Sequence, residues 1–173
     1  MKFFSFLAMA ACLLPGIAWA DITERDLQVA GRTFGFINGI PKGDVVIGIV
    51  VDEGNAASKA EADQLSGLLS GGLKVAKNTL QPKLIPVSAL DFSGTNVAFV
   101  TSGLGAQQAA IFAAASGAKI MTVSTDFSCV DAKQCVMGVA SKPKVKIQVS
   151  QSAAGATGLQ LSKALKLMVT ESD

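Results

Sequence analysis

The chain has 173 residues, a formal net charge of +2 and neither histidine nor tyrosine. Half of its residues are apolar and only 16% are charged, so the composition is that of a folded globular domain and excludes a disordered chain. A charge this close to neutral also lacks the basic excess of a nucleic-acid-binding protein. The absence of histidine excludes a Ser-His-Asp or Cys-His catalytic unit and any metal site with imidazole ligands.

The first 20 residues have the pattern of a cleavable export signal. Lys2 is followed by an apolar run over residues 3–14, and small residues precede the expected cleavage point before Asp21. We therefore expect a mature domain over residues 21–173 in the periplasm. The alternative is a lipoprotein attached through Cys12, although the lipid-attachment motif is a poor one. No later stretch reaches the about 20 apolar residues of a membrane span, so we expect no membrane insertion of the mature chain.

Helical periodicity opens the mature domain. Thr23 is a suitable N-cap for a helix that Gly39 and Pro41 would end. Four apolar residues of this helix recur at spacings of three and four and share one face: Leu27, Ala30, Phe34 and Ile37. The spacing predicts an amphipathic helix with that face in the core.

A buried strand and a second helix come next. The run over residues 45–51 is continuously apolar, which is typical of a strand buried on both faces of a parallel sheet. Ser58 and Glu61 have the spacing of a capping box, which predicts a helix that Gly71 and Gly72 end.

Strands and helices alternate through the rest of the chain. The pattern predicts strands at 84–87, 97–100, 119–124, 136–140 and 145–149, and helices at 107–116, at 152–157 and after Ser162. In the last strand apolar residues alternate with Lys146 and Gln148, so we expect an antiparallel hairpin with one face in solvent. The predicted fold is a single three-layer α/β domain, with a mostly parallel sheet flanked by helices and a late antiparallel hairpin.

The two cysteines of the mature domain, Cys129 and Cys135, lie close together in a polar loop. In an exported protein such a pair is expected to form a disulfide, which here would pin the loop and the start of the next strand. A redox sensor is the alternative, but the CxxC spacing of a thiol oxidoreductase is missing. We therefore predict a structural disulfide.

The carboxyl ends of the predicted parallel strands supply one candidate ligand site, because ligands gather there in open α/β sheets. It comprises the turn Ser102-Gly103-Leu104-Gly105 and Asp126. The turn resembles a phosphate cradle that leads into a helix N-terminus. A tight strand-to-helix turn needs glycine whether or not a ligand binds, however, and the remaining glycines of a nucleotide fingerprint are missing.

Other side chains permit further interpretations. Asp52, Glu53 and Asp126 could form a carboxylate pair or a hard-cation site, but acids at strand ends more often cap helices or face water. A serine nucleophile would need a lysine base such as Lys119, and no spacing places one there. We therefore expect no catalytic residue, no metal and no cofactor.

Three lysines of the hairpin, Lys142, Lys144 and Lys146, alternate along the chain and so are expected on one strand face. Such a row is usually a solvated face that guards against edge pairing. The functional alternative is a docking surface for an acidic partner.

Several stretches of the chain together match one known family. They are the opening helix running into Phe34-Gly-Phe-Ile-Asn-Gly-Ile-Pro41, the strand 45–51, and Lys144-Val-Lys-Ile-Gln-Val-Ser150 followed by Gly158-Leu159 and a Leu-rich helix. On these residues the chain resembles the YfiR/HmsC-type family of small exported proteins. Ile40 and Ser150 depart from it, since the family usually has Trp and Asn there. The pair Cys129 and Cys135 resembles one that members carry in this loop.

The resemblance implies a periplasmic, non-catalytic signalling protein. Family members repress a membrane-bound diguanylate cyclase by binding its periplasmic domain, and they form homodimers. For such a protein the candidate contact surfaces are the opening helix around Phe34 and Ile37, although Phe34 is rather expected in the core, and the hairpin with Lys142, Lys144 and Lys146. The alternative function is that of a periplasmic small-ligand-binding protein that uses the turn over residues 102–105.

Overall fold

The computed structural model describes residues 22–172. The expected signal peptide, residues 1–20, and its cleavage point lie outside the described residues. The helices are α1 (Glu24–Phe34), α2 (Ala56–Leu69), α3 (Gln108–Gly117), α4 (Phe127–Asp131), α5 (Gln151–Thr157) and α6 (Lys163–Met168). The strands are β1 (Ile37–Asn38), β2 (Gly43–Val51), β3 (Leu73–Val75), β4 (Asn78–Pro86), β5 (Val97–Val100), β6 (Met121–Ser124), β7 (Met137–Ala140), β8 (Lys146–Val149), β9 (Gln160–Leu161) and β10 (Thr170–Glu171). Within residues 22–172 no helix is long and apolar enough to cross a membrane.

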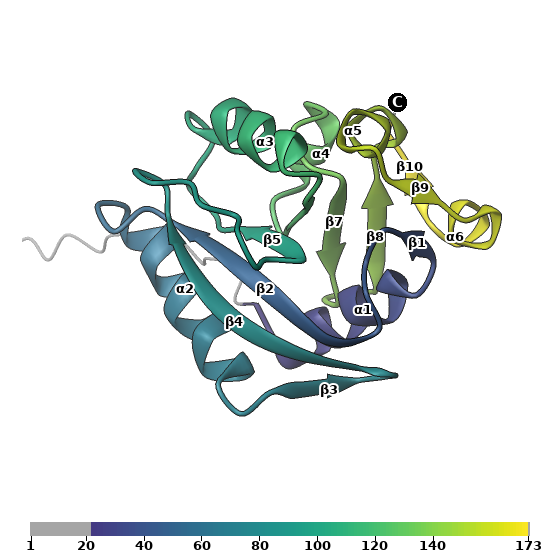
Figure 1. Ribbon diagram of the computed structural model, residues 1–173, viewed down its shortest axis with the longest axis horizontal. Coiled ribbons are helices and arrows are strands. Elements are labelled where there is room, and N and C mark those ends of the chain that lie inside the picture. Colours follow the sequence, from purple (N-terminus) through teal and green to yellow (C-terminus); the bar gives the residue numbers. More distant parts are fainter. Residues whose placement is uncertain (1–21, 173) are drawn as a thin grey trace, which may run out of the picture.

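Eight strands form one sheet in the order β10-β8-β7-β6-β5-β2-β4-β3, and β1 pairs with β9 in a separate ribbon. The five strands from β4 to β7 across the sheet are parallel, whereas β8 and β3 pair antiparallel with their inner neighbours. Figure 1 shows α2 running alongside β2 and β4, and α5, α6 and β9 gathered at the opposite end of the sheet. The predicted α/β domain with a mostly parallel sheet and a late antiparallel hairpin is confirmed.

Helices cover both faces of the sheet, and each face has its own apolar core. On one face α1 and α2 pack against the odd-numbered residues of β2. On the other face α3 and α4 enclose a second core around Val50, Val100 and Ile111. Because successive strand residues point to opposite faces, a strand between two such layers must be apolar throughout, and this explains the continuous apolar run of β2.

The structure corrects two helix boundaries. α1 ends at Phe34 rather than near Gly39, and Ile37 instead pairs with Leu161 of β9. This pairing joins segments far apart in the chain, so helical periodicity could not show it. The cap of α2 is Asn55, whose side chain accepts hydrogen bonds from two backbone N–H groups, and not Ser58.

The hairpin differs from the predicted one-sided strand. β8 begins only at Lys146, and Val145 before it is 49% exposed. Gln148, expected in solvent, is buried and donates a hydrogen bond to Asp131. The reason is that α4 packs over this face of β8 and supplies Asp131, while β10 pairs with the outer edge of the strand.

Candidate functional site

The order of strands in the sheet reverses at β2. The chain passes from β2 through α2 to β4 on one side, and β5 then returns to the other side of β2. In open α/β sheets the crevice outside the carboxyl ends of the strands at such a switch is the usual ligand site. The predicted turn, Ser102 to Gly105, follows β5 directly at this position.

A carboxylate of the protein itself occupies this position. Glu61 of α2 is only 6% exposed, and one of its oxygens accepts hydrogen bonds from the backbone N–H of Ser102 at 2.6 Å and from the Ser102 hydroxyl at 2.7 Å. Its second oxygen accepts from the hydroxyl of Thr125, after β6, at 2.7 Å. Three donors that could serve an anionic ligand therefore serve Glu61.

A second polar contact holds α2 against the same strand ends. The hydroxyls of Ser58 and Thr101 lie 2.6 Å apart, and Thr101 donates to the carbonyl oxygen of Val50 at 2.7 Å. Because the Thr101 proton is directed to Val50, the Ser58 hydroxyl is the donor between the two. Ser58 in turn accepts from the backbone N–H of Asp52 at 2.9 Å. These buried bonds fix α2 across the ends of β2 and β5.

The remaining residues of the predicted turn also have structural partners. Gly103 has a φ of +80°, and a Cβ there would come within 2.8 Å of the Asn55 side chain, so glycine is required on both counts. Asn55 donates to the Gly103 carbonyl at 3.1 Å. Gly105 is exposed and open, while Asp126 accepts from the backbone N–H of Ser128 as the N-cap of α4. These contacts give the residues of the turn and Asp126 structural partners within the fold.

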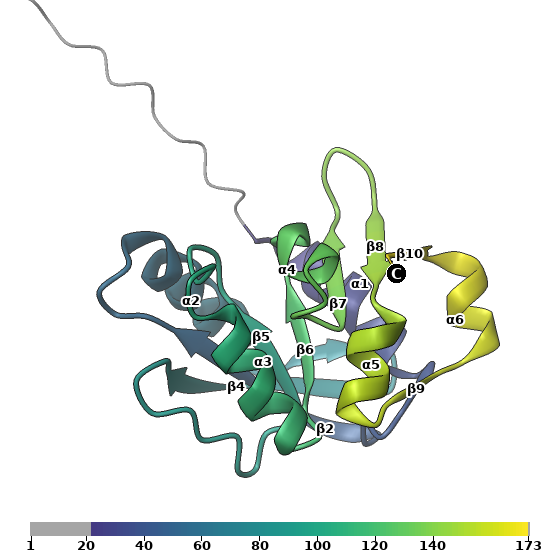
Figure 2. The same ribbon diagram turned by 90° about the horizontal axis from the view of Figure 1, so that it is seen from above.

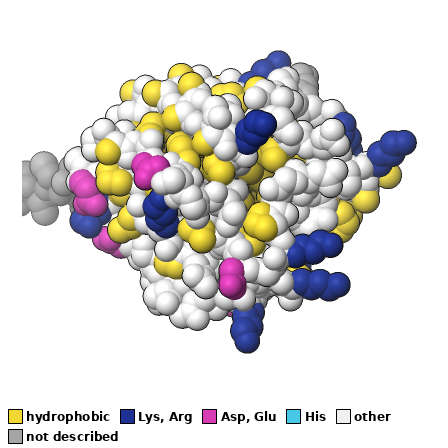
Figure 3. Space-filling view, viewed as in Figure 1, with side chains coloured by type: hydrophobic (Ala, Val, Ile, Leu, Met, Phe, Trp, Pro, Cys, Tyr) yellow, Lys and Arg dark blue, Asp and Glu magenta, His cyan; other side chains and the backbone are white. Residues whose placement is uncertain are grey.

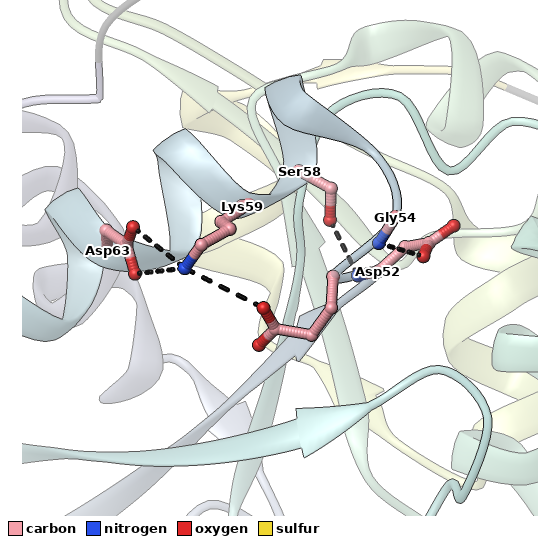
Figure 4. A network of polar contacts seen from close by, with 6 residues as sticks. Asp52, Gly54, Ser58, Lys59 and Asp63 are labelled. Carbon is pink, nitrogen blue, oxygen red and sulfur yellow. Dashed lines mark hydrogen bonds and ion pairs between the residues drawn. The ribbon is translucent and has the colours of Figure 1, made fainter.

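The acidic residues near β2 form no shared site. Figure 4 shows Asp52 bonded to the backbone N–H of Gly54, while Lys59 reaches Asp63 on its own helix. Lys59 also lies 3.7 Å from Glu53, and the hydrogen bond to Asp63 is the main cause that raises the pKa of this lysine. Among residues 22–172 no group of three or more His, Cys, Asp or Glu side chains could hold a metal ion.

Cys129 and Cys135 are joined by a disulfide, as predicted. Both residues are fully buried, and they belong to the core beneath α3 and α4. The bond links α4 to Cys135, two residues before β7. Its surroundings are apolar and closed to solvent, which is the environment of a structural disulfide.

The predicted contact surface is only partly exposed. Phe34 and Ile37 are 3% and 4% exposed, so the expectation that their side chains contact a partner is wrong: both belong to the core under α1. The expectation that the three lysines share one strand face is also wrong. Only Lys146 lies in β8, and its Nζ stacks 4.0 Å from the ring centroid of Phe127.

Lys142 and Lys144 instead lie in the loop between β7 and β8. Figure 2 shows this loop projecting from the body of the molecule. Both lysines are exposed, and the bond between Lys142 and Pro143 is cis. Over the face seen in Figure 3, basic and acidic side chains are scattered rather than gathered into one patch, so charge alone does not mark a site there.

Sequence reasoning missed the role of Glu61. Its spacing from Ser58 indicated a capping box, which explained the residue without any long-range contact. The position of Glu61 on the apolar face of its helix is the signal that could have shown this role. The buried residues of α2 include Glu61 together with Ala57, Ala62, Leu65 and Leu69. An acid at such a position needs buried donors.

By its fold and strand ends the protein is a three-layer α/β domain. Side chains of the domain itself fill the crevice where the strand order reverses. A structure of this fold is the ligand-free, open form of a substrate binding protein with adhesive properties from Clostridium difficile. The TM-score is 0.60 and the identity 13%, over 86% of this chain and 58% of that one, so the likeness concerns the fold alone and this chain spans little more than half of that protein.

The YfiR/HmsC-like family model matches residues 44–168, and the chain belongs to this family. The family consists of periplasmic regulators of cyclic-di-GMP signalling. No curated protein matches the chain.

Proposed function

We propose that this protein is a non-catalytic periplasmic regulator that represses a membrane-bound diguanylate cyclase by binding its periplasmic domain. Membership of the YfiR/HmsC-like family over residues 44–168 is the observation that carries the proposal. In this account the chain acts in the periplasm after removal of residues 1–20, and regulation requires contact between proteins rather than turnover of a substrate.

The strand-end crevice supports this proposal over the alternative of a small-ligand-binding protein. A ligand at the turn after β5 would have to displace the Glu61 carboxylate from the N–H and hydroxyl of Ser102 and from the hydroxyl of Thr125. Displacing a buried carboxylate leaves it without donors unless it moves into solvent, and this costs several hydrogen bonds to a charged group. The crevice therefore favours a rigid domain that acts through its outer surface.

The experiment is to measure cellular cyclic-di-GMP in a deletion strain that carries either the intact gene or a Cys129→Ser/Cys135→Ser variant. We expect the deletion to raise cyclic-di-GMP and the intact gene to restore the original level. The variant lacks the disulfide and should restore it only in part, in proportion to the folded protein that immunoblotting detects. An unchanged level in the deletion strain would refute the proposed function.

The alternative function makes its own prediction for the purified domain. A ligand that binds only the folded state raises the melting temperature by mass action. We expect no shift from small carboxylates and phosphates at millimolar concentration, because Glu61 already holds the donors of the crevice. A saturable rise that the Ser102→Ala variant abolishes would instead assign ligand binding to this edge.

A further inference from the structure

Most of the exposed large apolar side chains of the described residues lie near one another on the protein surface. Five are exposed: Phe36, Leu84, Val145, Leu167 and Met168. Leu84 lies alone on β4, whereas the other four lie at the end of α1, in the β7–β8 loop and on α6. Scattered apolar residues are normal on a protein surface, but a contiguous group of them indicates a contact site.

Two hollows make this group one continuous surface. The first lies between α1 and the β7–β8 loop and is lined by Arg25, Val29, Arg32 and Val145, with Glu24 and Gln28 at its side. The second has a volume of 200 Å³, lies between α1, β8 and α6, and is lined mainly by apolar side chains that include Phe36, Ile147 and Met168. Val29 and Arg32 line both hollows. We call the surface formed by Arg25, Val29, Arg32, Phe36, Val145, Ile147 and Met168 the α1–α6 face.

Contacts at both ends of α1 hold this face together. At the start of the helix, the hydroxyl of Thr23 lies 3.3 Å from that of Ser141 in the β7–β8 loop. At its end, the carbonyl of Phe36 accepts from the backbone N–H of Ser162, the N-cap of α6, at 2.9 Å. The three elements are therefore fixed relative to one another before any partner binds, which lowers the entropy cost of binding.

The charged groups of the face lack internal partners. The ion pairs among residues 22–172 involve Lys59 and Lys83 alone, so neither Arg25 nor Arg32 is paired with a carboxylate. Glu24 beside them accepts a hydrogen bond from Gln28 at 2.7 Å. Exposed Lys142 and Lys144 add positive charge in the adjacent loop. The surface thus combines apolar hollows with guanidinium groups, which bind carboxylates through two parallel hydrogen bonds.

We propose that the α1–α6 face is the docking site for a protein segment of the proposed partner that presents apolar side chains flanked by Asp or Glu. This inference rests on the proposed function and names the surface through which it acts. The apolar side chains would fill the two hollows, and the carboxylates would pair with Arg25 and Arg32.

Other occupants fit the surface less well. A two-fold interface joins the same patch on both subunits, so a second copy of the chain would place the cations of one face near the cations of the other. An anionic bilayer could attract the cations, but it is flat and would leave the hollows beneath it unfilled. A segment of protein meets both the charge and the shape.

The test is photocrosslinking in cells, with p-benzoylphenylalanine in place of Val145. The matched control carries the same residue in place of Leu84, which has a similar exposure of 53% against 49% but lies outside the face. We expect an adduct with the periplasmic domain of a membrane diguanylate cyclase from position 145 only. Mass spectrometry should place the crosslink in a segment rich in Asp or Glu, and Arg25→Glu/Arg32→Glu in the same chain should reduce the adduct at least tenfold.

The other outcomes reject the docking site, its occupant or the cyclase as the partner. Equal adducts from positions 145 and 84, or an adduct that the arginine variant leaves unchanged, would overturn the docking site. An adduct with the chain itself, or binding of the purified domain to phosphatidylglycerol vesicles that the arginine variant abolishes, would assign the face to a second copy or to lipid. An arginine-dependent adduct with an acidic segment of another periplasmic protein would keep the docking site and reject only the cyclase as partner.

Discussion

The strand-end crevice and the α1–α6 face are built in opposite ways. At the crevice, three donors from the ends of β5 and β6 converge, and Glu61 satisfies them from within. At the face, Phe36, Val145 and Met168 are exposed, and neither Arg25 nor Arg32 forms an ion pair among the described residues. The position where an α/β sheet usually binds ligands thus supports the structure of this protein, while the α1–α6 face is the surface that we propose for binding.

The largest effect on stability should follow from removing the Glu61 carboxylate from the crevice. Glu61→Ala leaves the N–H and hydroxyl of Ser102 and the hydroxyl of Thr125 without their acceptor, and it creates a cavity. We expect the free energy of unfolding to fall by about 3 kcal/mol, since buried donors that lose a charged partner cost 1–3 kcal/mol or more. Urea denaturation followed by circular dichroism measures it.

The control for this variant is Asp63→Ala on the same helix. Asp63 is exposed and, among residues 22–172, pairs with Lys59 alone, so its loss should cost less than about 0.5 kcal/mol. Equal effects of the two substitutions would show that Glu61 has no special structural role, and the contrast between crevice and face would then lose its basis.

The disulfide should have the next largest effect. Cys129→Ser/Cys135→Ser removes the constraint of a short loop and places two hydroxyls in an apolar core, so we expect a loss of about 2 kcal/mol or more. The readout is the melting temperature of wild type and variant, each with and without a reductant. A wild-type chain that melts at the same temperature in both conditions would contradict a stabilising disulfide.

A smaller, pH-dependent effect is expected at the start of α1. Burial raises the pKa of Asp26, but hydrogen bonds from Thr23 and Ser141 outweigh it and hold the pKa below its ordinary value. A carboxyl with a lowered pKa stabilises the folded state above the ordinary pKa, and this stabilisation is lost as the pH falls through the lowered value.

Asp26→Asn should therefore cost about 1 kcal/mol at pH 7, the usual value of a helix cap. The difference between wild type and variant should shrink below about pH 4, as the wild-type carboxyl takes up its proton. Unfolding in urea at pH 7, 4 and 3 tests this. A difference that stays constant over this range would mean that the charge of Asp26 contributes nothing.

The smallest effect on stability should come from the α1–α6 face. Met168→Glu alters a side chain that is 61% exposed, so we expect a change in unfolding free energy of less than about 0.5 kcal/mol. The same substitution should weaken binding of the partner. A loss of stability comparable to that of Glu61→Ala would place Met168 in the core and remove it from the docking face.

The sequence predicted those helices and strands whose pattern depends on residues nearby in the chain, or whose two faces are both buried. Residues 45–51 of β2 and all of β5 are apolar because helices cover both faces, and α1 shows its buried face through Leu27 and Ala30. The disulfide followed from cysteine spacing. What could not be predicted depends on contacts between distant segments: Ile37 is a strand residue because it pairs with β9, and Gln148 is buried where its side chain meets Asp131 of α4.

The candidate sites show the same limit. The turn after β5 and Asp126 were located correctly at the strand ends, but no local pattern shows that Glu61 would reach Ser102, 41 positions away. The α1–α6 face combines residues from three separate segments. Val29 and Phe36 become part of one surface with Met168 only after the β1–β9 ribbon brings α6 to the end of α1.

The most direct test of the central claim measures cellular cyclic-di-GMP in the deletion strain complemented with surface variants. The comparison is between Arg25→Glu/Arg32→Glu on the α1–α6 face and Lys74→Glu/Lys119→Glu, which makes the same charge change at exposed positions elsewhere. We predict that the lysine variant restores the wild-type level, while the arginine variant, at equal abundance, leaves cyclic-di-GMP as high as in the deletion strain. Full restoration by the arginine variant would contradict regulation through this face.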